Sequence, residues 1–368
     1  MNSASKPRVV VTNWIHDDVL DELASFAEPV ANRTREAWTR AQILERASDA
    51  DGLMVFMPDT IDDAFLAACP RLRIVAAALK GADNFDVAAC TRRGIWFTLV
   101  PDLLTVPTAQ LFIGLLLGVT RNILAGDTLV RSGNFAGWRP VLYGAGLSGR
   151  RLGFIGLGAV GRAAVRRLAG FDLDLCYHDP RRLDPAEESA LGLRWLPLSE
   201  LIATSHFLAP LVPLNANTLH LLDASALAAM PRGAYLINVC RGSVVDEAAV
   251  ADALARGHLA GYAADVYEME DWARSDRPPE IHPRLLAQSE RTLLTPHLGS
   301  ATEEARRAIA RAAIGQMRIA FAGGVPPAAI NPNISRAASP VTEMSRRGGA
   351  VAVNPGGVGP TGKRFTVA

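Results

Sequence analysis

A glycine-rich run lies between a strand-like segment and a helix-like segment near the middle of the chain. The apolar residues 152–155 are followed by Gly156-Leu157-Gly158-Ala159-Val160-Gly161, and a helical pattern occupies residues 162–168. Glycines at this spacing allow a tight turn and a close approach of the backbone to a phosphate group. Because the run follows a strand and opens a helix, it indicates a parallel sheet whose strands alternate with helices.

Strand-like and helix-like runs alternate over most of the chain. Besides residues 152–155, the strands that we expect are residues 8–12, 52–57, 72–78, 173–177, 206–209, 234–239, 261–266 and 292–295. The alternation predicts an α/β fold of two Rossmann-like or flavodoxin-like domains, with parallel sheets and an active-site cleft between the domains. A chain of 368 residues is long enough for two domains of this kind.

The two expected domains are interleaved along the chain. We assign residues 1–101 together with 301–335 to a discontinuous substrate-binding domain, because the helix expected at 301–322 follows the last strand and leads the chain back. Residues 102–300 form the dinucleotide-binding domain. Residues 336–368 are rich in Gly, Pro, Ser, Val and Arg without periodicity, so we expect a disordered tail.

Charge and cysteine content exclude several function classes. With 38 basic and 37 acidic residues the net charge is +1, so we expect neither nucleic-acid binding nor attachment to a membrane surface. The apolar run at residues 110–119 is about half the length needed to span a bilayer and predicts a buried helix. The four cysteines show no CxxC or metal-ligand spacing, and the short polar N-terminus is no secretory signal, so we expect reduced thiols, no metal and a cytoplasmic location.

An acidic residue after the next strand bears on the cofactor. Asp179 can accept hydrogen bonds from both ribose hydroxyls of a dinucleotide and would repel a 2′-phosphate, which favours NAD. Arg181 and Arg182 follow closely and could pair with a 2′-phosphate, so NADP use stays open but is less favoured. The alternative interpretation is that both arginines are solvated on a loop.

Three sequence runs late in the chain each contain a side chain that can bind an anion or exchange a proton. Arg241 lies in the run NVCRGSVVDE, Glu270 in DVYEMED and His297 in TPHLGS, and each follows an expected strand. The carboxyl ends of parallel strands meet at one edge of the sheet, so the three side chains could converge there. A carboxylate orients a neighbouring imidazole, and the pair can exchange a proton near neutral pH while an arginine holds an anion. Taken singly, each has an ordinary reading as a surface arginine, a surface glutamate or a core histidine.

These motifs resemble the D-isomer-specific 2-hydroxyacid dehydrogenase family over roughly residues 7–333. The resemblance implies two αβ domains, NAD in the cleft and a homodimer. It implies that Arg241 binds the substrate anion, that Glu270 supports the histidine and that His297 is the acid or base. The cofactor-binding residues that it implies are Thr108, Gly156, Gly158, Ala159, Val160, Gly161, Asp179, Val212, Pro213, Cys240, Asp265 and Gly299.

One loop departs from the common pattern of that family. Residues 77–86 read AALKGADNFD, and Lys80 puts a positive charge where relatives generally have an uncharged residue. Together with the runs VPDLLTVPTA and RSGNFAGW, this loop resembles a narrower group, the phosphonate (phosphite) dehydrogenases. The resemblance implies an anionic substrate, phosphite, which NAD oxidises to phosphate with water as the nucleophile. Our hypothesis is that His297 activates this water, and the identity of the base stays open at this point. The substrate residues that it implies are Lys80, Gly81, Met57, Leu104, Trp138, Tyr143, Ser300 and Arg306.

Two other functions remain open at this point. A D-2-hydroxyacid dehydrogenase, or a glyoxylate or hydroxypyruvate reductase, would use the same fold and the same three residues, and Lys80 is the feature that favours phosphite over it. A cofactor-sensing binding protein on this fold would tolerate loss of the acid and base. The intact set of Arg241, Glu270 and His297 argues against that third function.

Overall fold

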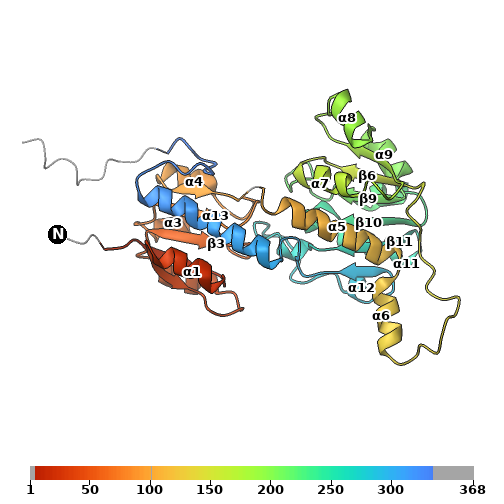
Figure 1. Ribbon diagram of the computed structural model, residues 1–368, viewed down its shortest axis with the longest axis horizontal. Coiled ribbons are helices and arrows are strands. Elements are labelled where there is room, and N and C mark those ends of the chain that lie inside the picture. Colours follow the sequence, from red (N-terminus) through yellow and green to blue (C-terminus); the bar gives the residue numbers. More distant parts are fainter. Residues whose placement is uncertain (1–4, 101, 335–368) are drawn as a thin grey trace, which may run out of the picture. The chain divides into compact units, whose positions relative to one another are not determined.

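The molecule contains two parallel sheets, each covered by helices on both faces (Figure 1). The computed structural model describes residues 5–100 and 102–334. The tail that we predicted to be disordered, residues 336–368, lies outside the described residues. The predicted α/β class with two parallel sheets is confirmed.

The smaller sheet has five strands in the order β2-β1-β3-β4-β5. In chain order these are β1 (Arg8–Val11), β2 (Glu28–Ala31), β3 (Gly52–Val55), β4 (Ile74–Ala77) and β5 (Trp96–Thr98). Its two faces pack into separate cores, one against α1 (Asp17–Ala24) and α13 (Glu303–Phe321), the other against α2 (Arg40–Ala47), α3 (Asp63–Ala67) and α4 (Val87–Arg92). Every strand pair is parallel, so their carboxyl ends share one edge.

The larger sheet has seven strands in the order β12-β11-β10-β9-β6-β7-β8. They are β6 (Arg151–Ile155), β7 (Asp174–His178), β8 (Leu193–Trp195), β9 (Phe207–Pro210), β10 (Ala234–Asn238), β11 (Leu259–Ala264) and β12 (Thr292–Leu294). The strand order reverses at β6, between β7 and β9. Ligands bind in open parallel sheets at such a reversal, outside the carboxyl ends of the strands.

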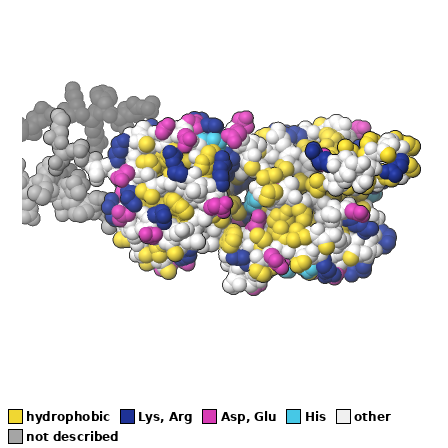
Figure 2. Space-filling model, turned by 90° about the horizontal axis from the view of Figure 1, so that it is seen from below, with side chains coloured by type: hydrophobic (Ala, Val, Ile, Leu, Met, Phe, Trp, Pro, Cys, Tyr) yellow, Lys and Arg dark blue, Asp and Glu magenta, His cyan; other side chains and the backbone are white. Residues whose placement is uncertain are grey.

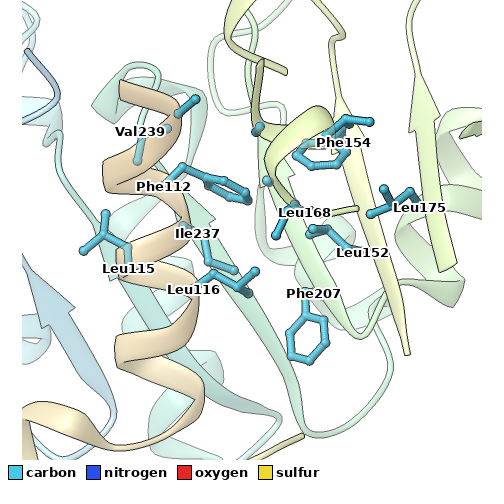
Figure 3. Close-up of a cluster of buried hydrophobic side chains, with 14 of the residues drawn as sticks. Phe112, Leu115, Leu116, Leu152, Phe154, Leu168, Leu175, Phe207, Ile237 and Val239 are labelled. Atoms are coloured by element: carbon cyan, nitrogen blue, oxygen red, sulfur yellow. The ribbon is translucent and has the colours of Figure 1, made fainter. Parts of the chain in front are cut away.

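Helices cover both faces of the larger sheet. On one face α5 (Thr105–Thr120) and α7 (Ala159–Arg167) build a core around Phe112, Leu116 and Phe154 (Figure 3). On the other face lie α9 (Leu198–Thr204), α10 (Ala224–Ala229), α11 (Glu247–Ala255) and α12 (Pro283–Leu286). Pro107 falls in the first turn of α5, where its missing N–H is not needed. The buried helix predicted around residues 110–119 is therefore part of α5.

Three short strands escaped the sequence patterns. All three, β2, β5 and β8, lie at the edges of their sheets. In β2, Pro29 stands at a position where a central strand would lose a ladder hydrogen bond, and an edge strand tolerates it. β2 and β8 are partly exposed and so produce a weak apolar signal, whereas β5 is buried but only three residues long.

Helix α13 returns the chain from the larger sheet to the smaller sheet. It packs against β3, β4, β5 and α1 of the smaller sheet although it follows β12 of the larger sheet in sequence. This packing agrees with the interleaved arrangement, while the boundaries that we placed at residues 101/102 and 300/301 stay a prediction.

Several surface and composition features bear on function. Figure 2 shows basic and acidic side chains interspersed over one face of the molecule. Among the described residues no single helix is long and apolar enough to cross a membrane, although α5 with α6 (Ile123–Arg131), bent by 64°, passes by length and composition together. All four cysteines are free, and no cluster of metal-ligating side chains occurs in the described part of the chain.

Candidate active site

A cleft of about 820 Å³ opens at the carboxyl ends of the strands of both sheets. Of the predicted cofactor residues, Gly156 and Asp179 alone lie outside the set that lines this cleft in the described structure. The predicted residues that do line it are Met57, Lys80, Gly81, Leu104, Thr108, Gly158, Ala159, Val160, Gly161, Val212, Pro213, Cys240, Arg241, Asp265, Glu270, His297, Gly299, Ser300 and Arg306. The structure therefore gathers residues that are up to 249 positions apart, from Met57 to Arg306.

The glycine-rich turn has the shape that a dinucleotide requires. Gly156 has φ +86°, and a Cβ there would lie 2.7 Å from Val212 Cγ1. At Gly158 a Cβ would meet no atom within 4 Å, so the backbone faces open space in the cleft. Helix α7 begins at Ala159, directly after that glycine, and its first N–H groups and positive dipole end suit a pyrophosphate. The residues present thus fit the predicted dinucleotide.

Asp179 links the glycine-rich turn to the end of β7. Its Oδ2 accepts a hydrogen bond from Leu157 N at 3.0 Å, and its Oδ1 accepts one from Arg181 N at 2.9 Å. The carboxylate is half-buried beside the turn. It therefore lies where an acidic residue contacts the ribose of a bound dinucleotide.

Arg241 follows β10 and points into the cleft. Its Nε donates to Asp83 Oδ2 at 3.0 Å and its Nη1 donates to Cys240 O at 2.7 Å. A Cβ at position 81 would lie 2.2 Å from Arg241 Nη2, so glycine at that position lets the guanidinium lie against the loop. Arg241 is thereby held in place while part of its fork of donors remains at the cleft surface.

His297 and Glu270 form a hydrogen-bonded pair. His297 Nδ1 lies 3.0 Å from Glu270 Oε2, and both side chains line the cleft. Nδ1 donates when the carboxylate is ionised, which leaves Nε2 as the nitrogen able to exchange a proton with a ligand. His297 has φ +55°, a left-handed conformation that costs a non-glycine residue about 1 kcal/mol. The surrounding structure must therefore hold this residue in place.

Asp265 fixes the loop that carries His297. Its carboxylate accepts hydrogen bonds from Thr295 Oγ1 at 2.6 Å, Leu298 N at 2.6 Å and Gly299 N at 2.8 Å. Burial raises the pKa of Asp265, and these hydrogen bonds oppose that rise. The geometry accounts for Asp265 as the anchor of the histidine loop, and its contact with the cofactor stays a prediction.

The turn that carries Glu270 is packed back to back with the turn after Arg241. The first turn is η2 (Glu268–Glu270) and the second is η1 (Gly242–Val244). A Cβ at Gly242 would lie 1.8 Å from the Tyr267 carbonyl carbon, so only glycine permits this approach. Ser243 N also donates to Asp271 Oδ2 at 2.8 Å. Arg241 and Glu270 are thus held by one tightly packed unit.

Two glutamates stabilise the same unit, because the side chain of each accepts a hydrogen bond from the backbone N–H of the other. Glu268 Oε1 accepts from Glu247 N at 3.0 Å, and Glu247 Oε1 accepts from Glu268 N at 2.8 Å. Both glutamates are buried, and Glu268 also contacts His220 at 2.9 Å and Arg274 at 3.4 Å. Sequence patterns missed this clamp, because a Glu beside a helix start has the ordinary reading of a capping residue.

The other wall of the cleft comes from the smaller sheet. Lys80 lines the cleft but is exposed. Asp59 is 3% exposed and accepts from Phe56 N at 2.7 Å and Thr12 Oγ1 at 2.5 Å, which fixes the turn that presents Met57. Burial raises the pKa of Asp59 to about 6. Further lining residues that the sequence did not single out are Asn13, Trp14, Phe56, Asp83, Met269 and Trp272.

Arg306 and Ser300 lie together at the start of α13. Arg306 Nη1 donates to Ser300 Oγ at 3.4 Å, and its guanidinium carbon lies 5.6 Å from the centre of the Phe56 ring. Burial lowers the pKa of Arg306. The pair therefore supplies a partly desolvated cation to the cleft.

Trp138 and Tyr143 do not reach this cleft in the single chain. They are 83% and 78% exposed and lie in the irregular segment after α6, which Figure 1 shows running along the end of the larger sheet. The prediction that they shape the pocket is not met by one chain. The aromatic residues of this segment gave no indication in the sequence of the direction in which they point.

Together, the fold and the site define a nicotinamide-dependent oxidoreductase whose cleft is lined by residues from both sheets. Residues 113–299 match the NAD-binding domain of the D-isomer specific 2-hydroxyacid dehydrogenases, and the chain belongs to this family. It is 35% identical to a glyoxylate reductase of Thermococcus litoralis, over 91% of this chain and all of the relative. It is 36% identical to one of Pyrococcus furiosus, over 91% and 98%.

A solved structure shows the same fold. It is an NADPH-dependent glyoxylate/hydroxypyruvate reductase from Sinorhizobium meliloti in complex with NADP and malonate, 31% identical, with a TM-score of 0.76 over 90% of this chain and 100% of that chain. The predicted cofactor, NAD with NADP as the less favoured possibility, is confirmed by the family match and this relative.

The predicted oxidation of phosphite is wrong. The relatives are named for glyoxylate and hydroxypyruvate, which supports the alternative reading instead. The prediction depended on Lys80 joining Arg241 in a strongly cationic pocket. Lys80 and Arg241 both line the cleft, but a cationic cleft suits the carboxylate of a 2-oxo acid as well as phosphite, so it does not select phosphite.

Proposed function

We propose that this protein reduces a small 2-oxo acid, of the glyoxylate and hydroxypyruvate class, to the corresponding 2-hydroxy acid. The observation that carries the proposal is the His297–Glu270 pair at 3.0 Å, which lines the same cleft as Arg241. An anion-binding fork beside a histidine–carboxylate pair matches a substrate that has a carboxylate next to a carbonyl. The names of the relatives support this substrate class.

In this proposal Arg241 binds the substrate carboxylate and sets its orientation. Asp83 Oδ2 and Cys240 O fix the Nε and Nη1 sides of the guanidinium, so binding requires little further ordering of the side chain. Lys80 and Arg306, which both line the cleft, add positive potential that favours an anion.

His297 supplies the proton that the carbonyl oxygen takes up. Glu270 accepts from Nδ1 and stabilises the imidazolium, and Nε2 gives its proton to the developing alkoxide. The bound nicotinamide supplies the hydride when it is in its reduced form. The loop anchored by Asp265 keeps His297 in its left-handed conformation throughout, so that the imidazole need not reorganise during proton transfer.

The substrate assignment is tested by NADH oxidation followed at 340 nm with glyoxylate, hydroxypyruvate and pyruvate. We expect turnover with at least one of the first two. The proposal fails if none of the three is reduced while NADH binds, and that result would favour a cofactor-sensing binding protein.

We also propose that the protein acts as a homodimer. All nine residues of α6 are at least partly exposed, and Ile123, Leu124 and Val130 are 58%, 47% and 57% exposed. Burial of such residues by a second copy would remove apolar area from water. Light scattering coupled to gel filtration measures the mass directly, and a monomer at micromolar concentration contradicts the proposal. The cytoplasmic location stays a prediction.

A further inference from the structure

The loop after β7 carries an arginine, Arg182, that makes two hydrogen bonds to one carboxylate. Arg182 Nε donates to Glu188 Oε1 and Arg182 Nη2 donates to Glu188 Oε2, both at 2.8 Å. Two parallel N–H···O bonds of this kind form the strong, geometrically specific pairing of a guanidinium with a carboxylate. Glu188 belongs to α8 (Pro185–Leu191), which follows the loop directly.

Glu188 is a buried acceptor with a second donor. Its residue is 8% exposed, and Tyr177 Oη donates to Oε1 at 2.8 Å while accepting from Leu183 N at 2.8 Å. Arg182, and Tyr177 to a smaller extent, hold the pKa of Glu188 below its ordinary value. If Arg182 left this carboxylate, Glu188 would keep only the tyrosine, and an underpaired carboxylate costs about 1–3 kcal/mol.

The same loop begins at the ribose-contacting acid. Asp179 is three residues before Arg182 and accepts from the glycine-rich turn through Leu157 N. An arginine near this acidic position is what accommodates a 2′-phosphate in proteins that take NADP. The other cation beside the turn, Arg162 of α7, donates to Glu187 Oε1 at 2.7 Å. Two consecutive carboxylates of α8 thus engage Arg162 and Arg182.

We infer that Glu188 is a specificity-determining residue for the cofactor, because it holds Arg182 away from a 2′-phosphate. Asp179 repels that phosphate, and the Arg182–Glu188 pair removes one of the two arginines, Arg181 and Arg182, that could compensate. NAD is favoured by both effects. The inference concerns the NAD-binding domain and is independent of the 2-oxo acid that the enzyme reduces.

The test measures binding of NAD⁺ and NADP⁺ to the full chain by calorimetry without substrate. Glu188→Gln keeps the shape and the tyrosine contact but removes the charge, so we expect NADP⁺ to bind about tenfold more tightly and NAD⁺ to change less than about twofold. Arg182→Met in the wild-type background leaves NADP⁺ binding within about twofold. In the Glu188→Gln background the same substitution abolishes the gain.

The matched control is Glu187→Gln, which removes an equal charge from the same helix and releases Arg162 instead of Arg182. Equal gains in NADP⁺ affinity for Glu187→Gln and Glu188→Gln would overturn the inference in favour of a general charge effect. A loss of NADP⁺ affinity in Arg182→Met alone would also overturn it, because the arginine would then already reach the phosphate. Unchanged NADP⁺ affinity in Glu188→Gln, with an unaltered melting temperature, would show that Arg182 cannot reach it.

Discussion

The two walls of the cleft hold their functional side chains in different ways. On the larger-sheet wall, buried carboxylates hold both reactive segments through backbone hydrogen bonds. Asp265 accepts from the His297 loop, and Glu247 accepts from Glu268 N of the Glu270 turn, while Glu268 and Asp271 accept from Glu247 N and Ser243 N. On the smaller-sheet wall, one buried carboxyl, Asp59, supports the turn before Met57, and Lys80 is exposed.

We interpret this difference by the roles proposed for the two walls, proton transfer on the larger-sheet wall and attraction of the substrate anion on the smaller-sheet wall. Groups that move a proton require a fixed geometry, and a network of buried acceptors supplies it. A cation at the cleft surface acts through its potential and tolerates movement, so it needs no such support. Two hydrogen bonds join the walls, from Arg241 Nε to Asp83 and from Ala273 N to Asn84 Oδ1 at 3.2 Å.

The largest expected effect comes from His297→Ala on the larger-sheet wall. We expect kcat to fall by about 10²–10⁴-fold, because the carbonyl oxygen loses its proton donor, while NADH binding measured by fluorescence is retained. His220→Ala is the matched control, since His220 pairs with Glu268 as His297 pairs with Glu270 but does not line the cleft in the described structure. Comparable losses in both variants would remove the distinction between the two pairs.

Asp59→Asn tests the support of the smaller-sheet wall through pH. Burial raises the pKa of Asp59 from 3.8 to about 6, so the folded protein holds the proton more tightly than the unfolded chain between these values. Stability from the protonated carboxyl is present below pH 4 and is lost as pH rises through about 6.

Wild type should therefore lose up to about 3 kcal/mol relative to Asp59→Asn between pH 4 and pH 7. Urea unfolding of both proteins across this range measures the difference. A constant difference between them would show that Asp59 is ionised at all these pH values.

Glu268→Ala removes one half of the reciprocal clamp. The Glu247 N–H would lose its buried acceptor, and we expect the free energy of unfolding to fall by about 2 kcal/mol. We also expect kcat to fall more than KM changes, because η2 also carries Glu270. Glu280→Ala, at an exposed acid, is the control and should alter neither quantity measurably. If Glu268→Ala matches it, the clamp does not position the turn.

Lys80→Met should have the smallest effect of the four. An exposed charge contributes less than about 1 kcal/mol, so we expect KM for the 2-oxo acid to rise about threefold with kcat unchanged. The KM of the wild type should rise with ionic strength more steeply than that of the variant. A large fall in kcat would place Lys80 among the groups that act in the transition state and would break the contrast between the walls.

Much of the fold could be predicted because the patterns are local. The apolar runs of the central strands and the glycine-rich turn each report one strand or one strand–turn–helix unit, and Arg241, Glu270 and His297 follow strands whose ends must meet. The edge strands β2 and β8 were missed because half-exposed strands carry few apolar residues. The substrate was misassigned because the positive charge of Lys80 favours any small anion and does not distinguish phosphite from a 2-oxo acid.

The sequence by itself indicated the α/β class, the glycine-rich turn and the three residues Arg241, Glu270 and His297 that line one cleft, since each lies in or directly after a local strand or turn pattern. Only the tertiary structure decided which charges are already satisfied. The Arg241–Asp83, Arg182–Glu188 and Glu247–Glu268 contacts span 158, 6 and 21 positions, and no local pattern distinguishes them from solvated residues. Whether a charge is available to a ligand depends on its partners in space, and those are set by packing.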